Sequence, residues 1–180
     1  MIRNFLFLIV VLTLTSFKYP AKEWHEYKLE GSNCSLLMPG APTKQEKLIN
    51  TAAGEITFTL FTFEPADSTD DNFIYGLAYV DFPADKLYPD SISWVKGCLD
   101  NARDGAISNV HGKFLSEIII KYKQYSGREI RIDFQNGAAV LTARLYLIKN
   151  RLYTLQVLTL PDNDFNNSIK KFFDSFMTLE

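Results

Sequence analysis

Residues 127–160 have the sequence GREIRIDFQNGAAVLTARLYLIKNRLYTLQVLTL. This stretch contains three segments rich in aliphatic, aromatic and β-branched residues. Asn136-Gly137 separates the first segment from the second, and Asn150-Arg151 separates the second from the third. Asn-Gly between two such segments is typical of a two-residue hairpin turn, because both residues tolerate a positive φ. The stretch therefore predicts an antiparallel meander of strands at residues 127–134, 138–148 and 152–160.

Further strands are predicted outside this meander. Residues 55–64 alternate apolar and polar side chains, as a half-buried strand does. Residues 73–82 are nearly all apolar, which favours a central strand covered on both faces. The remaining predicted strands lie at residues 24–30, 34–38, 44–49 and 114–122.

Two amphipathic helices are also predicted, each after a proline. The first follows Pro89, with Asp90 or Ser91 as N-cap, and the second follows Pro161, with Asp162 or Asp164 as N-cap. Their apolar faces are Ile92, Val95, Leu99, Ala102 and Ala106, then Phe165, Ile169, Phe172, Phe173 and Phe176. The order of elements predicts an α+β fold, an antiparallel sheet of about six to eight strands sandwiched between helices.

The N-terminus has the pattern of a secretory signal peptide. A basic start with Arg3 precedes the apolar run FLFLIVVLTL at residues 5–14, and small polar residues follow. The run is shorter than the ~20 residues of a membrane-spanning helix. We expect a signal peptide at residues 1–21 and one extracytoplasmic (periplasmic or secreted) domain at residues 22–180. An uncleaved N-terminal membrane anchor and a buried first strand are the alternatives.

Cys34 and Cys98 are the only two cysteines. Cys34 shares a predicted strand face with Leu36 and Met38, and Cys98 lies beside the apolar stripe of the first helix. Both residues can therefore lie between helix and sheet, where a disulfide would form in an oxidising compartment. The alternative is a pair of buried free thiols that pack as small apolar groups.

The composition argues against several classes of function. The net charge of −2 does not favour nucleic-acid binding, and the two histidines are too few for a histidine-rich metal site. The nucleophile elbow, the Walker loop and the zinc-protease motif are absent from the sequence. We therefore assign no catalytic, cofactor-binding or metal-binding residue.

One polar constellation stands out in the meander. Glu129, Arg131 and Asp133 alternate with apolar residues, so the three charges share one face of a strand. The predicted hairpin places Arg144 opposite Glu129 on the next strand. The four residues form either cross-strand ion pairs on a sheet surface, contributing ~0.2–1 kcal/mol each, or a charged binding face.

Several short motifs from Trp24 to the C-terminus resemble the PsbP-like fold family, named for an extrinsic subunit of the photosynthetic oxygen-evolving complex. They are Pro39-Gly40, Arg144-x-Tyr146, Arg151-Leu152-Tyr153-x-Leu155-x-Val157 and Asp174-Ser175-Phe176. The resemblance implies an antiparallel sheet between helix layers and a non-enzymatic, protein-binding role.

We accordingly expect an exported accessory module that binds another exported or envelope protein. After signal cleavage it is expected to have no strong membrane association. An exported hydrolase with an unrecognised site and a membrane-tethered structural domain are the alternatives.

Overall fold

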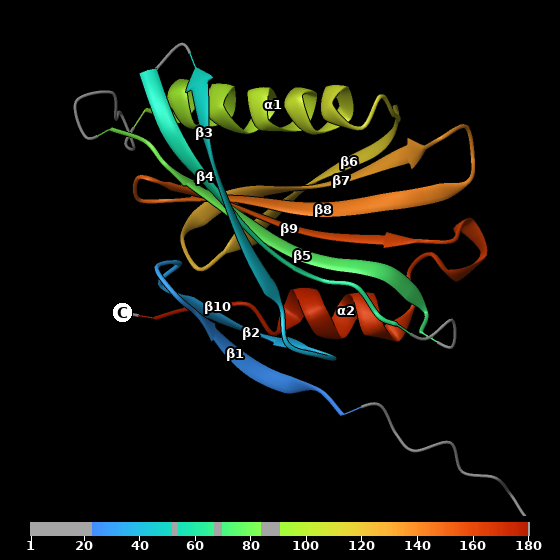
Figure 1. Cartoon of the computed structure of the whole chain (residues 1–180). Helices are drawn as coiled ribbons and strands as arrows, with labels where there is room; N and C mark the ends of the chain where they lie inside the picture. The colour runs from blue at the N-terminus through green and yellow to red at the C-terminus, as the bar shows by residue number, and fades with distance from the viewer. Residues whose placement is uncertain (1–22, 52–53, 67–69, 84–90, 180) are drawn as a thin grey trace, which may run out of the picture.

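A seven-stranded antiparallel sheet organises the chain (Figure 1). The computed structural model describes residues 23–51, 54–66, 70–83 and 91–179, so the predicted signal peptide lies outside the described residues. The strand order is β3-β4-β5-β9-β8-β7-β6. The strands are β3 (Thr43–Thr51), β4 (Gly54–Phe63), β5 (Asn72–Asp81), β6 (Lys113–Tyr122), β7 (Tyr125–Phe134), β8 (Ala139–Ile148) and β9 (Arg151–Thr159).

The β7–β8 hairpin has the predicted register. Gln135, Asn136 and Gly137 all have positive φ angles, and the Asp133 carboxylate accepts a hydrogen bond from the Gly137 amide at 2.6 Å. Glu129 is paired with Arg144, as the turn chemistry predicts. The predicted order of strands within the meander is confirmed, with β7, β8 and β9 as neighbours.

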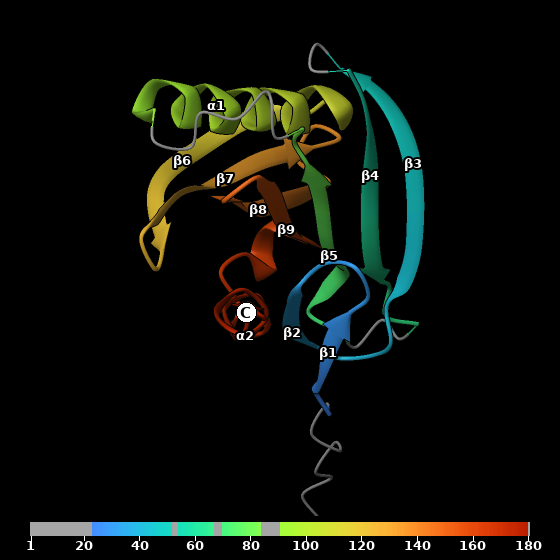
Figure 2. The ribbon, with the colours of Figure 1, turned by 90° about the vertical axis from the view of Figure 1, so that its left-hand side faces the viewer.

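Helix α1 (Ile92–Asn109) covers one face of the sheet (Figures 1 and 2). The Ser91 hydroxyl caps it by accepting a hydrogen bond from the Trp94 amide at 3.3 Å. Leu99 is fully buried at the centre of this layer, whereas Ile92, a member of the predicted apolar stripe, is 86% exposed. The buried cluster beneath α1 is Leu99, Ile130, Ile132, Leu141, Ala143, Leu145 and Leu147.

The opposite face is covered by helix α2 (Asn167–Asp174) together with a second sheet. This three-stranded sheet has the order β1-β2-β10, from β1 (His25–Leu29), β2 (Cys34–Met38) and β10 (Met177–Thr178). The predicted layer of helices is therefore only partly correct, because the small sheet shares this face with α2 (Figure 2). Neither helix in the described part of the chain is long and apolar enough to cross a membrane.

Helix α2 begins later than the sequence predicts. Residues Pro161–Asn163 form a separate 3-10 helix, and the N-cap is Asn166, whose side chain accepts from the Ile169 amide at 2.9 Å. Capping by Asp162 or Asp164 is therefore wrong. Phe165, expected on the buried face, has a φ of 64° and is 71% exposed. The other four residues of the predicted face, Ile169, Phe172, Phe173 and Phe176, are buried.

The two cysteines lie on opposite sides of the large sheet. Cys34 is fully buried in the layer that contains α2, whereas Cys98 packs in the layer beneath α1. Both are free thiols. Because the sheet separates the two side chains, the possible disulfide does not form and the two free thiols hold, Cys34 fully buried and Cys98 half-buried.

Candidate functional site: an apolar cavity beside helix α1

A cavity of ≈ 570 Å³ lies between α1 and the large sheet. In Figure 2, β3 and β4 rise beside α1 at one edge of the sheet, while the other strands run beneath it. The wall facing the helix is therefore made by side chains from several strands. The apolar residues of this wall are Ile49, Ile56, Phe58, Ala78, Val80, Phe82, Leu141 and Leu152.

The helix side of the cavity is formed by small residues. Ala102, Gly105 and Ala106 lie close together on α1, and all three line the cavity. A Cβ atom placed at Gly105 would have no heavy-atom neighbour within 4 Å. Because no large side chain projects from this part of α1, space remains between the helix and the strands.

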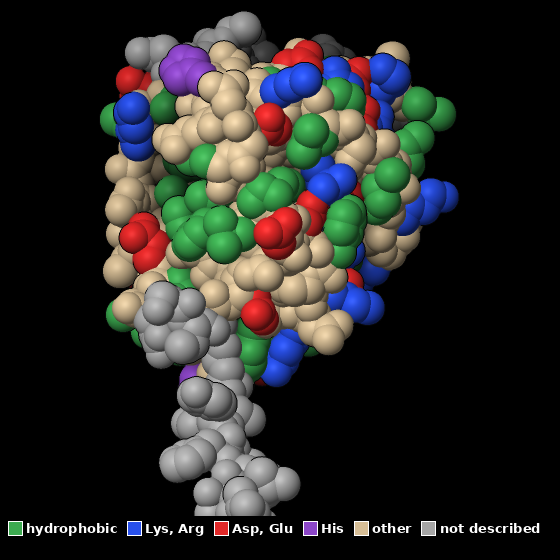
Figure 3. All heavy atoms as spheres, turned by 90° about the vertical axis from the view of Figure 1, so that its right-hand side faces the viewer, with side chains coloured by type: hydrophobic (Ala, Val, Ile, Leu, Met, Phe, Trp, Pro, Cys, Tyr) green, Lys and Arg blue, Asp and Glu red, His purple; other side chains and the backbone are tan. Residues whose placement is uncertain are grey.

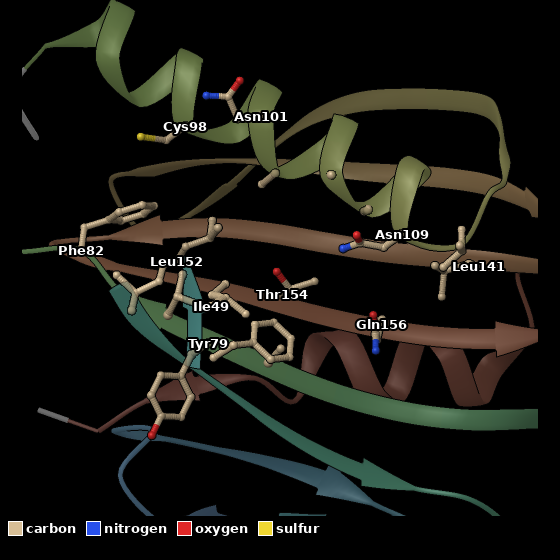
Figure 4. A pocket seen from close by; sticks show the side chains of 18 residues that line it. Ile49, Tyr79, Phe82, Cys98, Asn101, Asn109, Leu141, Leu152, Thr154 and Gln156 are labelled. Carbon is tan, nitrogen blue, oxygen red and sulfur yellow. The ribbon is translucent and has the colours of Figure 1, made fainter. Parts of the chain in front are cut away.

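A few uncharged polar groups are set into this apolar lining (Figure 4). Asn101 and Asn109 come from α1, and Thr154 and Gln156 come from β9. Among the described lining residues there is no Asp, Glu, Lys, Arg or His. A charged ligand would be desolvated here without an opposite charge, so the cavity favours an uncharged apolar group.

The lining offers little for catalysis. Two titratable residues, Cys98 and Tyr79, line the cavity, but Tyr79 turns its phenol away from α1 and packs in the core on the other side of the sheet (Figure 4). Burial raises the pKa of Cys98, whereas an activated thiol nucleophile needs a lowered pKa. Among the described residues, no group of His, Cys, Asp and Glu side chains is placed to hold a metal ion. The arrangement is suited to binding.

The predicted charged face lies on the opposite side of the sheet and contacts the segment around α2. Arg144 Nε is 2.6 Å from Glu129 Oε2, and Arg144 Nη1 is 3.0 Å from Asp174 Oδ1. Arg131 forms an ion pair with Asp164.

Three of the four charges of this face have a charged partner within the chain, and the fourth, Asp133, accepts a hydrogen bond from the Gly137 amide. The hydrogen bond from Lys170, together with that from Arg144, holds the pKa of the Asp174 carboxyl below its usual value. Figure 3 shows basic and acidic side chains next to one another on one side of the molecule, without a large patch of one sign. Arg144 therefore connects the sheet to α2, Arg131 connects it to the segment before α2, and the charged binding face remains a prediction.

No family model and no curated protein matches this sequence. Solved structures do match. The solution structure of cyanobacterial PsbP (CyanoP) from Synechocystis sp. PCC 6803 aligns with a TM-score of 0.52, covering 87% of this chain and 93% of that one at 12% identity. The fold is PsbP-like. A protein of unknown function from Pseudomonas aeruginosa, PA94, described as a putative regulator, aligns with a TM-score of 0.34 over 78% of this chain and 85% of that one, at 10% identity.

The cavity of this PsbP-like sheet was not predicted from the sequence. Its lining comes from α1 and from five strands, β3, β4, β5, β8 and β9, which are distant along the chain. Helical periodicity places Ala102 and Ala106 on the packed face of the helix. Their small size, next to Gly105, was the available signal that this part of the face does not fill the space above the sheet.

Proposed function

We propose that this chain is an exported, non-catalytic accessory module that binds an uncharged apolar group in the cavity beside α1. The observation that carries the proposal is a ≈ 570 Å³ cavity lined by apolar side chains and carboxamides, with no charged side chain among its described lining residues. Apolar cavities with a few polar groups are the usual form of ligand sites. The PsbP-like fold supports an accessory role, and the pattern of residues 1–21 supports export.

The apolar group can come from an exported or envelope protein or from a small molecule. In either case the driving force is the removal of apolar surface from water. Asn101 and Asn109 are exposed, so their carboxamides can bond to polar atoms next to the bound group. The partner is therefore expected to present an apolar side chain or acyl chain next to a neutral polar group.

The test uses the fluorescent probe N-phenyl-1-naphthylamine and two matched variants of α1. Gly105→Leu places a side chain in the cavity, whereas Gly97→Leu adds the same side chain to the same helix at a position outside the cavity lining. A Cβ atom at either glycine would have no heavy-atom neighbour within 4 Å, so both variants should fold. We expect Gly105→Leu to weaken probe binding at least about tenfold, which is ~1.4 kcal/mol, and Gly97→Leu to leave it unchanged.

Two competitors distinguish the sources of the apolar group. Displacement of the probe by a long-chain alcohol but not by apolar peptides would indicate a small-molecule ligand, and the reverse result would indicate a protein partner. Equal probe binding by the two leucine variants would place the probe elsewhere and contradict the proposed site.

A further inference from the structure

Strand β6 carries exposed apolar side chains on both faces at one edge of the large sheet. It is the last strand in the sheet order, and among the described strands only β7 pairs with it. Ile118 is 55% exposed and Ile119 is 74% exposed, on opposite faces of the strand. Edge strands with exposed apolar side chains are ready to pair with another strand.

The other edge of the same sheet is different. Strand β3 includes Lys44, Glu46 and Lys47, all of them exposed, and Lys44 is 2.9 Å from Glu46. Charged side chains on an edge strand oppose pairing with a second chain. The β3 edge has one exposed large aliphatic side chain, Leu48, next to these charges, whereas the centre of the β6 edge has two neighbouring ones, Ile118 and Ile119.

The regular part of β6 is symmetric about Ile119. The pairing of β6 with β7 is interrupted at Leu115, where the register shifts, and then runs without a break from Ser116 to Tyr122. Ile119 is the middle residue of this stretch. When a second copy of β6 pairs antiparallel with the first and the pairing is centred on Ile119, the two Ile119 residues lie opposite each other. Glu117 of each copy then lies opposite Lys121 of the other, so this charge pair occurs twice.

In this register the side chains on both faces of β6 lie opposite suitable partners. Residues 117, 119 and 121 lie on the α1 side, because Glu117 contacts Arg128 and Arg103 there, with Arg128 Nε 3.0 Å and Arg103 Nη1 3.1 Å from its carboxylate oxygens. On the α2 side, Ile118 faces Ile120. Centring the pairing on Ile118 instead would place Glu117 opposite Ile119 and lose both charge pairs.

We propose that two copies of this chain associate through β6, in an antiparallel two-fold pairing centred on Ile119. The two large sheets then form one continuous sheet, with both α1 helices on the same side. Main-chain hydrogen bonds hold the two strands together, and the isoleucines and the Glu117–Lys121 pairs set the register. An edge-to-edge contact is smaller than the ~1,600 Å² of a standard interface, so the dimer is reversible.

Disulfide trapping tests the register. In a Cys98→Ser background, Ile119→Cys places the new thiol opposite itself across the two-fold axis, within bridging distance. Ile118→Cys is the control on the same strand, because its symmetry mate is displaced along the strand. Leu48→Cys, 62% exposed on β3, is the control on the other edge. We expect the Ile119→Cys variant to form covalent dimers at least about tenfold faster than either control, and equal rates would overturn the proposal.

Sedimentation equilibrium of the purified chain gives an independent measurement. We expect the mass to rise from monomer towards dimer with increasing concentration. Ile119→Lys, which places like charges opposite each other, should keep the chain monomeric, and Leu48→Lys should not. Both sites are exposed, so both variants should fold, and a melting curve that matches the wild type at concentrations where the wild type is monomeric confirms it. A dimer retained by Ile119→Lys and lost in Leu48→Lys would place the interface at β3.

Discussion

Arg144 and Glu129 face each other across β7 and β8, with Arg144 Nε 2.6 Å from Glu129 Oε2. The same guanidinium reaches Asp174 on α2 and lies 4.9 Å from the centre of the Phe173 ring. One arginine therefore connects two strands of the large sheet with the helix that packs against them.

We expect Arg144→Ala to lower the free energy of unfolding by about 1–3 kcal/mol. The side chains of Arg144 and Glu129 are 22% and 17% exposed. The loss should exceed the ~0–1 kcal/mol of a surface pair and stay below the ~3–5 kcal/mol of a fully buried one. Urea unfolding measures it. Lys170→Ala, which removes an exposed partner of the same Asp174, should cost under about 0.5 kcal/mol. Equal losses in the two variants would contradict this prediction.

A second prediction compares two phenylalanines near α2. Phe172 is fully buried and Phe165 is 71% exposed. We expect Phe172→Ala to destabilise the protein by about 3–5 kcal/mol, because it removes a large core side chain and leaves a cavity. Phe165→Ala should cost less than about 1 kcal/mol. Thermal and urea unfolding of both variants check this, and a larger loss for Phe165→Ala would show that Phe165 is part of the core.

The strands of the meander could be predicted because their signals are local. A run of aliphatic, aromatic and β-branched residues marks each strand, and Asn136-Gly137 fixes a turn that sets Glu129 opposite Arg144. The Ser91 cap of α1 is likewise a matter of neighbouring residues. These features depend on a few consecutive positions, so one sequence is enough to reveal them.

The features that could not be predicted depend on distant segments. Strand β10 consists of Met177–Thr178 and exists because these residues pair with Cys34 and Ser35 on β2. Periodicity suggested that Phe165 is buried, but Asn166 begins the helix and leaves Phe165 outside it. Periodicity also cannot tell which face of a sheet a helix covers. The face that each helix covers decides that the two cysteines lie on opposite sides of the sheet. It also decides where the cavity lies, with its lining from six elements.

A third prediction concerns export. The basic start, the apolar run at residues 5–14 and the small residues after it predict cleavage between Ser16 and Ala21. We expect the protein isolated from its native host to begin near residues 17–22. Intact-mass measurement and N-terminal sequencing check this. A full-length product in the cytoplasm would contradict export, and a full-length product in the membrane would support the uncleaved anchor.

The last prediction concerns the pH dependence of stability. Cys34 is fully buried, with its sulfur 3.1 Å from the Ser32 hydroxyl. Burial, partly opposed by the Ser32 hydrogen bond, raises the pKa of this thiol from 9.0 to about 11. Above about pH 9 the unfolded chain loses the thiol proton while the folded chain keeps it. The stabilisation from Cys34 is therefore complete below about pH 9 and is lost as the pH rises towards about 11, by at most about 2–3 kcal/mol.

Urea unfolding at several pH values between about 8 and 10.5 measures this effect in the wild type and in Cys34→Ala. The variant lacks one core sulfur and should be less stable at pH 8, with a difference that narrows as the pH rises. Burial, with a further contribution from Cys34, raises the pKa of Tyr153 to about 12, so the comparison uses the points below about pH 10, where tyrosines of the unfolded chain also keep their proton. Parallel stability curves would contradict the prediction, because they would show that the Cys34 thiol titrates alike in the folded and unfolded chains.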